Sequence, residues 1–428
     1  MKQQPMSDQT LAKLQRDTFG YFQHETNLTN GMVPDNTRTG AHASIAAIGL
    51  GLATYPVAVE QSFISRDEAV DRVLTTLRFF WTSPQGMESD ATGYKGFYYH
   101  FLHMDTGRRA WESELSTIDS TILIAGALTT ATYFDQETEL EKEIRQLADD
   151  LYRRIDWQWA MNGGPKVSMG WKPECGFLPY WWEGYDEAIL LHVLGIASPT
   201  YPLPPETYQA FTSTYSWKEI YGIEFLYGGP LFMHQISHLW IDFREIQDEF
   251  MSEKGIDYFE NSRRATYIQQ QYAIRNPNGF KGYGEATWGI TASDGPGPAV
   301  LTIDGIERSF FDYESRGVPY GPDDGTIAPW AVVASLPFAP EIVLPTLRSF
   351  NDLYPDMTSK YGFKCSFNPT FNGENEKGWI SKGYYGLDQG PVVIMIENYR
   401  TDFFWELMKK CRYISDGLRK AGFKGGWL

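Results

Sequence analysis

Six stretches of the chain are apolar or small on every side, with no polar face that could meet water. A helix without a polar face is normally buried all round. The sequence therefore predicts six inner helices, over residues 41–54, 122–131, 188–197, 231–240, 327–338 and 391–396.

Amphipathic segments alternate with these stretches. Ile144, Leu147, Leu151 and Ile155 recur at helical spacing among charged residues, which predicts an outer helix with one wet face. The simplest arrangement for alternating outer and inner helices is an all-α, (α/α)6 toroid, six inner helices ringed by six outer ones. No linker or low-complexity tract interrupts the chain, so we expect a single domain over 1–428. The outer segments are 11–24, 67–81, 137–155, 258–274, 341–354 and 402–418.

Two long segments between the predicted helices, 93–111 and 157–182, are rich in Tyr, Phe and Trp and lack a helical period. Loops of this length in a compact domain are usually functional. Each inner segment begins just after a polar or aromatic loop. If the inner helices run parallel, their N-termini meet at one mouth of the toroid, where we expect the functional site.

Composition limits the ligand. Hydrophobic residues make up 42% and aromatic residues 15%, which is enough for a large core and a binding surface. The 37 Lys and Arg against 54 Asp and Glu give a net charge of −17, which disfavours nucleic acid and anionic lipid as partners. The three cysteines, Cys175, Cys365 and Cys411, form neither a disulfide framework nor a zinc motif.

No apolar run is long enough to cross a bilayer, and residues 1–5 lack the apolar segment of a signal peptide. We therefore expect a soluble monomer, cytoplasmic as the sequence stands, or periplasmic where a leader has been removed. No GxSxG elbow, phosphate loop or dinucleotide fingerprint occurs in the sequence.

Carboxylates and aromatic rings adjoin one another in residues 181–188, directly before the third inner segment. Sugars stack their C–H faces on such rings, and glycosidic cleavage requires two carboxyl groups. Glu183, flanked by Trp182, is expected to be the general acid, because indole rings disfavour a charged carboxyl. A helix-dipole role is the alternative for Glu183 and the favoured interpretation for Asp186 and Glu187.

Before the second inner segment, Ser116 and Asp119 match a helix N-cap with an acidic residue three positions on. Capping alone explains Asp119. Glu112 and Glu114 lie beside Trp111, where they serve either a sugar site or a solvated acidic loop.

Polar residues also precede or begin the last three inner segments. His234 and His238 share one helix face, but Gln235 stands where a zinc protease needs Glu, so we expect core or sugar-binding histidines and no metal. Glu285 lies near Trp288, whereas turn chemistry accounts for much of the Asp-Gly and Pro-Asp content nearby. Asp388 either caps the last inner helix or accepts sugar hydroxyls.

Six ordered motifs spanning nearly the whole chain resemble the bacterial glucoamylase-like family, which includes endo-β-1,2-glucanases and a domain of cyclic β-1,2-glucan synthases. The motifs are SELSTID (113–119), WEGYDEA (182–188), HQ with WIDFR (234–244), GITASDGP (289–296), PDDGT (322–326), and GLDQGP with ENYR (386–400).

The resemblance implies an (α/α)6 toroid that hydrolyses β-glucan, with β-1,2-glucan or its oligosaccharides as the first candidate substrate, and without metal or cofactor. Glu183 and Glu114 match acidic motif positions; we expect Glu183 to protonate the leaving group, and Glu114 or Asp119 to position or activate water. A polysaccharide lyase, an inactive glycan-binding protein and a transglycosylase remain alternatives. The predicted substrate-binding residues are Trp111, Glu112, Trp181, Trp182, His234, Gln235, Glu285, Trp288, Asp294, Asp323, Tyr385 and Asp388, with Trp111, Trp181, Trp182, Trp288 and Tyr385 as stacking platforms.

Overall fold

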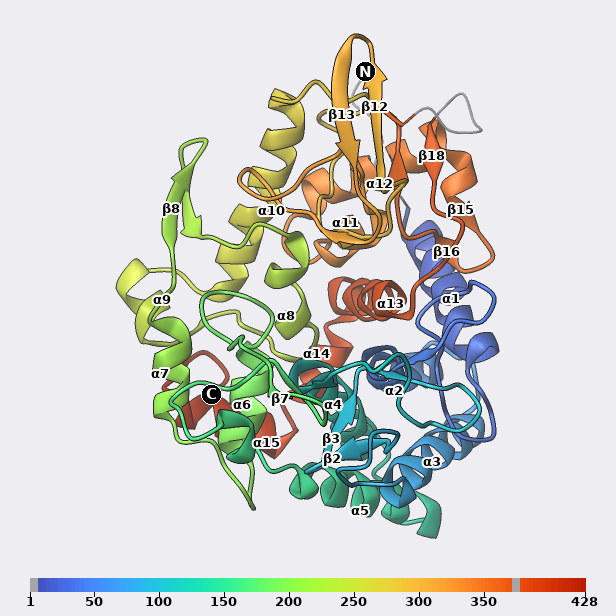
Figure 1. Ribbon diagram of the computed structural model, residues 1–428, viewed down its shortest axis with the longest axis vertical. Coiled ribbons are helices and arrows are strands. Elements are labelled where there is room, and N and C mark those ends of the chain that lie inside the picture. The colour runs from blue at the N-terminus through green and yellow to red at the C-terminus, as the bar shows by residue number, and fades with distance from the viewer. Residues whose placement is uncertain (1–6, 372–377) are drawn as a thin grey trace.

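Helices dominate the computed structural model, which describes residues 7–371 and 378–428 (Figure 1). The inner segments form α2 (Ile45–Glu60), α4 (Thr117–Tyr133), α6 (Ile189–Ala197), α8 (Ile236–Trp240), α11 (Pro329–Ala334) and α13 (Gly386–Thr401). The outer segments form α1 (Asp8–Glu25), α3 (Arg66–Thr82), α5 (Glu139–Arg154), α10 (Tyr258–Arg275), α12 (Pro340–Leu353), and α14 (Phe403–Met408) with α15 (Arg412–Lys420). The pattern did not predict α7 (Glu206–Thr212) or α9 (Glu249–Lys254).

The inner helices pack against one another, and the outer helices surround them. Helix α2 contacts α4 and α13, α6 contacts α4 and α8, and α13 also contacts α8 and α11. In Figure 1, α13, α2 and α4 lie near the centre, with α1, α3, α5, α10 and α12 outside them. One hydrophobic core extends through these helices, from Leu11 in α1 to Leu418 in α15.

The fourth inner segment is not the continuous helix that was predicted. It is a 3-10 turn, η2 (Leu231–His234), followed by the short helix α8. Gln235 interrupts the helix, with φ −125°, and its side-chain amide donates to Ala331 O at 2.7 Å and to Ser335 Oγ at 2.8 Å. The break thus lets a buried amide bond to the segment of α11.

The prediction of an all-α fold omitted a small antiparallel sheet. Its order is β2 (Gly93–Tyr94), β3 (Phe97–Tyr99), β5 (Leu115–Ser116), β6 (Gly170–Lys172), β7 (Gly176–Phe177). The two long aromatic segments therefore contribute strands to one sheet. Beside it, β1 (Ala43–Ser44) pairs with β4 (Phe101–Leu102).

The other strands form two-stranded pairs. The longer ones are β8 (Trp217–Ile220) with β9 (Ile223–Leu226), and β12 (Ala299–Ile303) with β13 (Ile306–Phe310), which projects at the top of Figure 1. The shorter pairs are β10 (Ile246–Gln247) with β19 (Lys424–Gly425), β11 (Ala292–Ser293) with β14 (Glu314–Ser315), β15 (Thr358–Ser359) with β16 (Gly362–Phe363), and β17 (Phe367–Asn368) with β18 (Trp379–Ile380).

Strand pairs lead directly into two inner helices. Ser44 ends β1 and caps α2, and Ser116 ends β5 and caps α4 through a hydrogen bond from Asp119 N at 3.2 Å. Across 7–371 and 378–428, no helix combines the length and apolarity needed to cross a membrane. Residues 1–5, on which the expectation about a signal peptide rested, lie outside the described residues.

Candidate active site

Strand register brings a histidine and two carboxylates together. His100 follows β3 and Glu114 precedes β5, so the pairing of Tyr99 with Leu115 places them opposite each other. His100 Nδ1 lies 2.8 Å from Glu114 Oε1, and Nε2 lies 3.6 Å from Asp119 Oδ2. His100 and Glu114 have side chains 30% and 29% exposed, so this cluster opens to solvent.

The capping pattern predicted for α4 also orients its acid. Ser116 Oγ donates to Asp119 Oδ2 at 2.6 Å while accepting from the Asp119 backbone amide. The N-cap serine therefore fixes one oxygen of Asp119 in the first turn of α4. Capping and participation in the acidic cluster occur together at this residue.

The histidine in this cluster is held in its charged form. Burial favours neutral imidazole, but the charge of Asp119 and the hydrogen bond and charge of Glu114 outweigh burial and raise the pKa of His100 to about 9. Burial alone would raise the pKa of Glu114, yet its contact with His100 leaves that pKa below the ordinary value. At neutral pH, an imidazolium thus lies between Glu114 and Asp119.

Glu187 is a third carboxyl in this cluster, just before α6. It is partly buried, and its backbone carbonyl accepts from Ser237 Oγ at 2.7 Å. Burial, together with negative charge on Asp119, raises the pKa of Glu187 to about 7. Its neighbour Asp186 forms a local turn before α6, with Oδ1 accepting from Ala188 N at 2.8 Å. The interpretation of Glu187 as a helix-dipole acid missed its approach to Asp119, which sequence alone does not reveal.

The cluster continues across the start of α13. Asp35 is a further carboxyl in the electrostatic neighbourhood of His100 and Asp119, and its carbonyl accepts from Gly386 N at 2.8 Å. Asp388, in the first turn of α13, is 1% exposed, and within the described part of the chain neither of its carboxyl oxygens has a hydrogen-bond partner. Burial raises the pKa of Asp388 well above its usual range, although the nearby Cys365 thiol acts in the opposite direction. The inner helices α4, α6 and α13 therefore bring carboxyl groups together at one end.

A polar and aromatic group borders Asp388. Asp294 is fully buried and accepts from Arg38 Nη2 and from Ser381 Oγ, each at 2.6 Å. Tyr385, predicted as a stacking platform, is only 6% exposed because Arg38 and Tyr313 each lie 5.8 Å from its ring. Tyr313, which the sequence analysis missed, is 47% exposed and offers the accessible ring instead.

Trp111, predicted as a stacking platform, presents an exposed ring. It is 63% exposed and lies 4.2 Å from the His42 ring and 5.1 Å from Phe101, between ring centroids. Trp111 and the exposed Glu112 both adopt positive φ, 56° and 52°, an uncommon conformation for two successive non-glycine residues. Trp181 is partly buried, and its backbone forms an isolated antiparallel β-bridge with Ser168.

The environment predicted for Glu183 is wrong. Its side chain is 43% exposed and forms an ion pair with Lys166 rather than lying among indole rings. The neighbouring Trp182 points inward, where its Nε1 donates to Thr117 Oγ1 at 2.9 Å. Adjacent positions in an irregular segment face opposite directions, so proximity in sequence did not produce an enclosed carboxyl.

Two predicted stacking residues belong to the core. Trp182 is 6% exposed and Trp288 is 0% exposed, and Trp288 Nε1 donates to Thr346 Oγ1 at 2.8 Å. Indole rings buried with satisfied N–H groups pack against protein and have no free face for a sugar.

Four other residues from the predicted binding set have protein partners or an exposed turn position, and His234 matches the core alternative. His234 is buried and Nε2 contacts Gly228 O at 3.0 Å, while burial lowers the pKa of His234 to about 4. Gln235 bonds within the core, as described above. Glu285 is exposed in a turn, and Asp323 accepts from Tyr272 and Tyr283 at 2.8 and 2.6 Å. These contacts have structural explanations that need no ligand.

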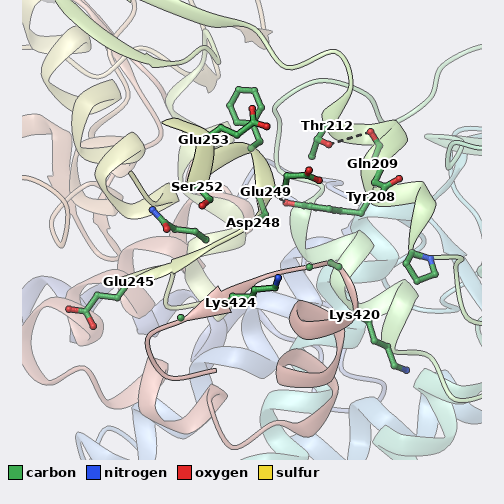
Figure 2. A pocket seen from close by; sticks show the side chains of 16 residues that line it. Tyr208, Gln209, Thr212, Glu245, Asp248, Glu249, Ser252, Glu253, Lys420 and Lys424 are labelled. Carbon is green, nitrogen blue, oxygen red and sulfur yellow. Dashed lines mark hydrogen bonds between the residues drawn. The ribbon is translucent and has the colours of Figure 1, made fainter. Parts of the chain in front are cut away.

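A hollow of about 790 Å³ lies elsewhere, between α7, α9 and β19 (Figure 2). Its lining contains Glu249, Glu253 and Lys424 but none of the predicted site residues. Asp248, at its base, is already bonded by two tyrosine hydroxyls and a backbone amide. This hollow is separate from the acidic cluster.

The comparisons with known proteins agree with the resemblance in the motifs. Residues 179–412 match the Glycoamylase family model. An exo beta-1,2-glucooligosaccharide sophorohydrolase (non-reducing end) of Parabacteroides distasonis is 28% identical over 97% of this chain. The chain spans 58% of that curated relative's length.

Solved structures show the same fold over the full chain. An endo-beta-1,2-glucanase from Chitinophaga pinensis, solved with sophorotriose and glucose, is 26% identical, with a TM-score of 0.86, covering 99% of this chain and 100% of that one. A beta-1,2-glucanase from Parabacteroides distasonis is 27% identical, with a TM-score of 0.85, covering 98% of this chain and 60% of that one.

Proposed function

Because the chain belongs to the Glycoamylase family, we propose that it is a glycoside hydrolase that cleaves β-1,2-linked glucan or its oligosaccharides. The names of the three relatives described above support this linkage. We further propose that the helices form a single (α/α)6 toroid, with the acidic cluster at the end where α4, α6 and α13 begin. The expected partner is a neutral glucan, which the net charge of −17 does not repel.

The observation that carries the proposal is Glu187, a partly buried carboxyl group whose pKa burial and the negative charge of Asp119 raise. A general acid must hold a proton near neutral pH, and the pKa of about 7 of Glu187 meets that requirement. Glu114, whose pKa His100 holds below its ordinary value, and Asp119, beside the same imidazole, suit the second carboxylate role. Glu187 therefore replaces Glu183 as the proposed donor to the leaving glycosidic oxygen, with Asp119 or Glu114 accepting a proton from the attacking water.

The ends of the cluster supply binding surfaces in this proposal. Trp111 and Tyr313 offer exposed rings on which a glucose face can stack. Asp388, buried without a partner, and the Arg38–Asp294 pair are suited to bonding sugar hydroxyls.

The decisive experiment compares Glu187→Gln with Glu183→Gln. Glutamine keeps the size of the side chain but cannot donate a carboxyl proton, so Glu187→Gln is expected to lower kcat by about 10²–10⁴-fold. Glu183→Gln is the matched control, since it removes only an exposed ion pair, and kcat is expected to stay within about twofold. Near-normal turnover by Glu187→Gln would remove Glu187 from the mechanism.

A substrate panel tests the linkage and the alternatives together. Linear and cyclic β-1,2-, β-1,3-, β-1,4- and α-1,4-glucans would be incubated with the protein, and products followed by NMR for size and anomeric configuration. New reducing ends from β-1,2-glucan alone support the proposal. A product absorbing in the ultraviolet would indicate a lyase, longer oligosaccharides a transglycosylase, and binding without product an inactive glycan-binding protein.

A further inference from the structure

The backbone of His100 is fixed from two sides. Its amide donates to Glu114 O at 2.9 Å, and its carbonyl accepts from Ile45 N, in the first turn of α2, at 3.2 Å. The imidazole stacks on Phe101 with ring centroids 4.0 Å apart and an interplanar angle of 14°. The ring therefore has a set position between α2 and the start of α4.

Each imidazole nitrogen faces a different carboxylate. Nδ1 is 2.8 Å from Glu114 Oε1 and Nε2 is 3.6 Å from Asp119 Oδ2. Neutral imidazole carries one N–H, so it can donate to one of these groups only, whereas imidazolium carries two. Ser116 Oγ contacts the same Asp119 oxygen, so two neighbours define the direction of this carboxylate.

We propose that His100 is a positioning residue for hydrolysis: its imidazolium, set between Glu114 and Asp119, holds both carboxyl groups in the orientation needed for reaction with water. This inference rests on the proposed function. His100 acts through the two acids, and nothing in the proposal requires it to contact the sugar. It explains how several carboxyl groups can gather in one site while Glu114 remains an anion.

Charge around His100 is mainly negative. From the loop before α2, Asp35 faces it, with Arg38 close to Asp35. At the start of α6, Glu187 is close enough to Asp119 for the negative charge of Asp119 to raise its pKa. The positive charge of Lys172, in β6, helps to lower the pKa of Glu114. Without the imidazolium, Glu114 loses the hydrogen bond and the positive charge that lower its pKa, so its proton affinity rises.

The test is His100→Asn in the full chain. The asparagine amide can still donate toward Glu114 but carries no charge. We expect the acidic limb of the kcat/KM profile on a β-1,2-glucooligosaccharide to move up by about one pH unit or more, with KM within about twofold of wild type at the pH optimum. His24→Asn is the matched control, because His24 is exposed at the end of α1, and its profile is expected to stay unchanged.

Two outcomes would overturn the proposal: an unchanged profile in His100→Asn, or a raised KM with the limb unmoved, which would make His100 a substrate ligand. A measurement on the unmutated side chain covers the case in which His100→Asn does not fold. Imidazole NMR of the wild-type protein should show both nitrogens of His100 protonated at neutral pH, and Glu114→Gln should lower the titration midpoint. A midpoint near the ordinary 6.5 in the wild-type protein would contradict the proposal.

These readouts also separate the two hypotheses. If the wild-type protein cleaves no β-1,2-glucan, the proposed function fails, whereas the NMR titration still reports whether His100 is an imidazolium held by the two carboxylates. If the protein cleaves the glucan and the titration is ordinary, only the inference about His100 fails.

Discussion

Among the single residues, Asp388 combines full burial with two carboxyl oxygens that have no partner in the described part of the chain. Its pKa is raised well above the unfolded value, so ionisation favours unfolding as the pH rises above that value. Replacement by Asn removes this effect. Asp388→Asn is therefore expected to raise the free energy of unfolding at neutral pH and to change it little near pH 4. Hydrolytic activity is expected to fall.

Urea unfolding at two pH values, with activity measured in parallel, checks this prediction. Asp248→Asn is the control, since Asp248 is also buried but accepts bonds from Tyr208, Tyr258 and Met251 N. The free energy of unfolding of Asp248→Asn is expected to fall by roughly 1–3 kcal/mol, because an amide cannot accept all of these hydrogen bonds as well as a carboxylate. Equal destabilisation by both substitutions would contradict the prediction that the buried Asp388 carboxyl group lowers the stability of the fold at neutral pH.

Glu187 gives a prediction about the alkaline side of the activity profile. Its protonated form is the proposed acid, so kcat/KM should decline as the pH rises through about 7. The negative charge of Asp119 contributes to this raised pKa. In Asp119→Asn the residual activity should therefore decline at lower pH than in the wild type, and a limb that stays in place or moves to higher pH would refute the coupling.

At the scale of elements, the N-cap residue of α4 both stabilises the helix and orients a proposed catalytic acid. Ser116→Ala removes the cap and the donor to Asp119 Oδ2, so it should cost about 1 kcal/mol of stability and also lower kcat. Ser65→Ala, at the cap of the outer helix α3, is the matched control, since Ser65 Oγ accepts from Glu68 N, at 3.1 Å, and lies outside the acidic cluster. Urea unfolding and initial rates should show similar stability losses but a loss of kcat in Ser116→Ala alone.

The helices were the part of the fold that the sequence could predict. Inner segments such as α2 and α4 lack a polar face, and outer ones such as α5 have one. The local sequence pattern therefore predicts how deeply each helix is buried. The sheet was not predictable in this way, because strands of two or three residues leave no alternation to detect. Gln235 broke the fourth inner segment through a bond to Ala331, a partner distant in sequence.

Over the whole molecule, the site depends on contacts that no local pattern contains. The gathering of helix starts was predicted, and Asp119 and Asp388 do lie at those of α4 and α13. His100 was missed because only the pairing of β3 with β5 brings it to Glu114. Glu183 and Glu187 are four residues apart in one motif, yet the former is exposed and the latter partly buried. Only the fold distinguishes them.

The contact between α1 and α13 gives a prediction for the molecule as a unit. Gln15 of α1 is fully buried, and Nε2 donates to Val393 O at 3.0 Å and to Glu397 Oε2 at 2.8 Å. Gln15→Ala leaves both acceptors without this donor, so the free energy of unfolding should fall by about 1–3 kcal/mol. Lys13→Ala on the same helix removes an exposed ion pair with Asp17 and should cost at most about 1 kcal/mol.

Because α1 and α13 are far apart in sequence but packed together, the loss at Gln15 should weaken the whole fold rather than one helix. Urea unfolding followed by far-ultraviolet circular dichroism and by tryptophan fluorescence should give coincident transitions in wild type and in Gln15→Ala, both shifted to lower urea in the variant. Separate transitions in Gln15→Ala, with α1 lost first, would show that the contact holds one helix and does not couple the two ends of the chain.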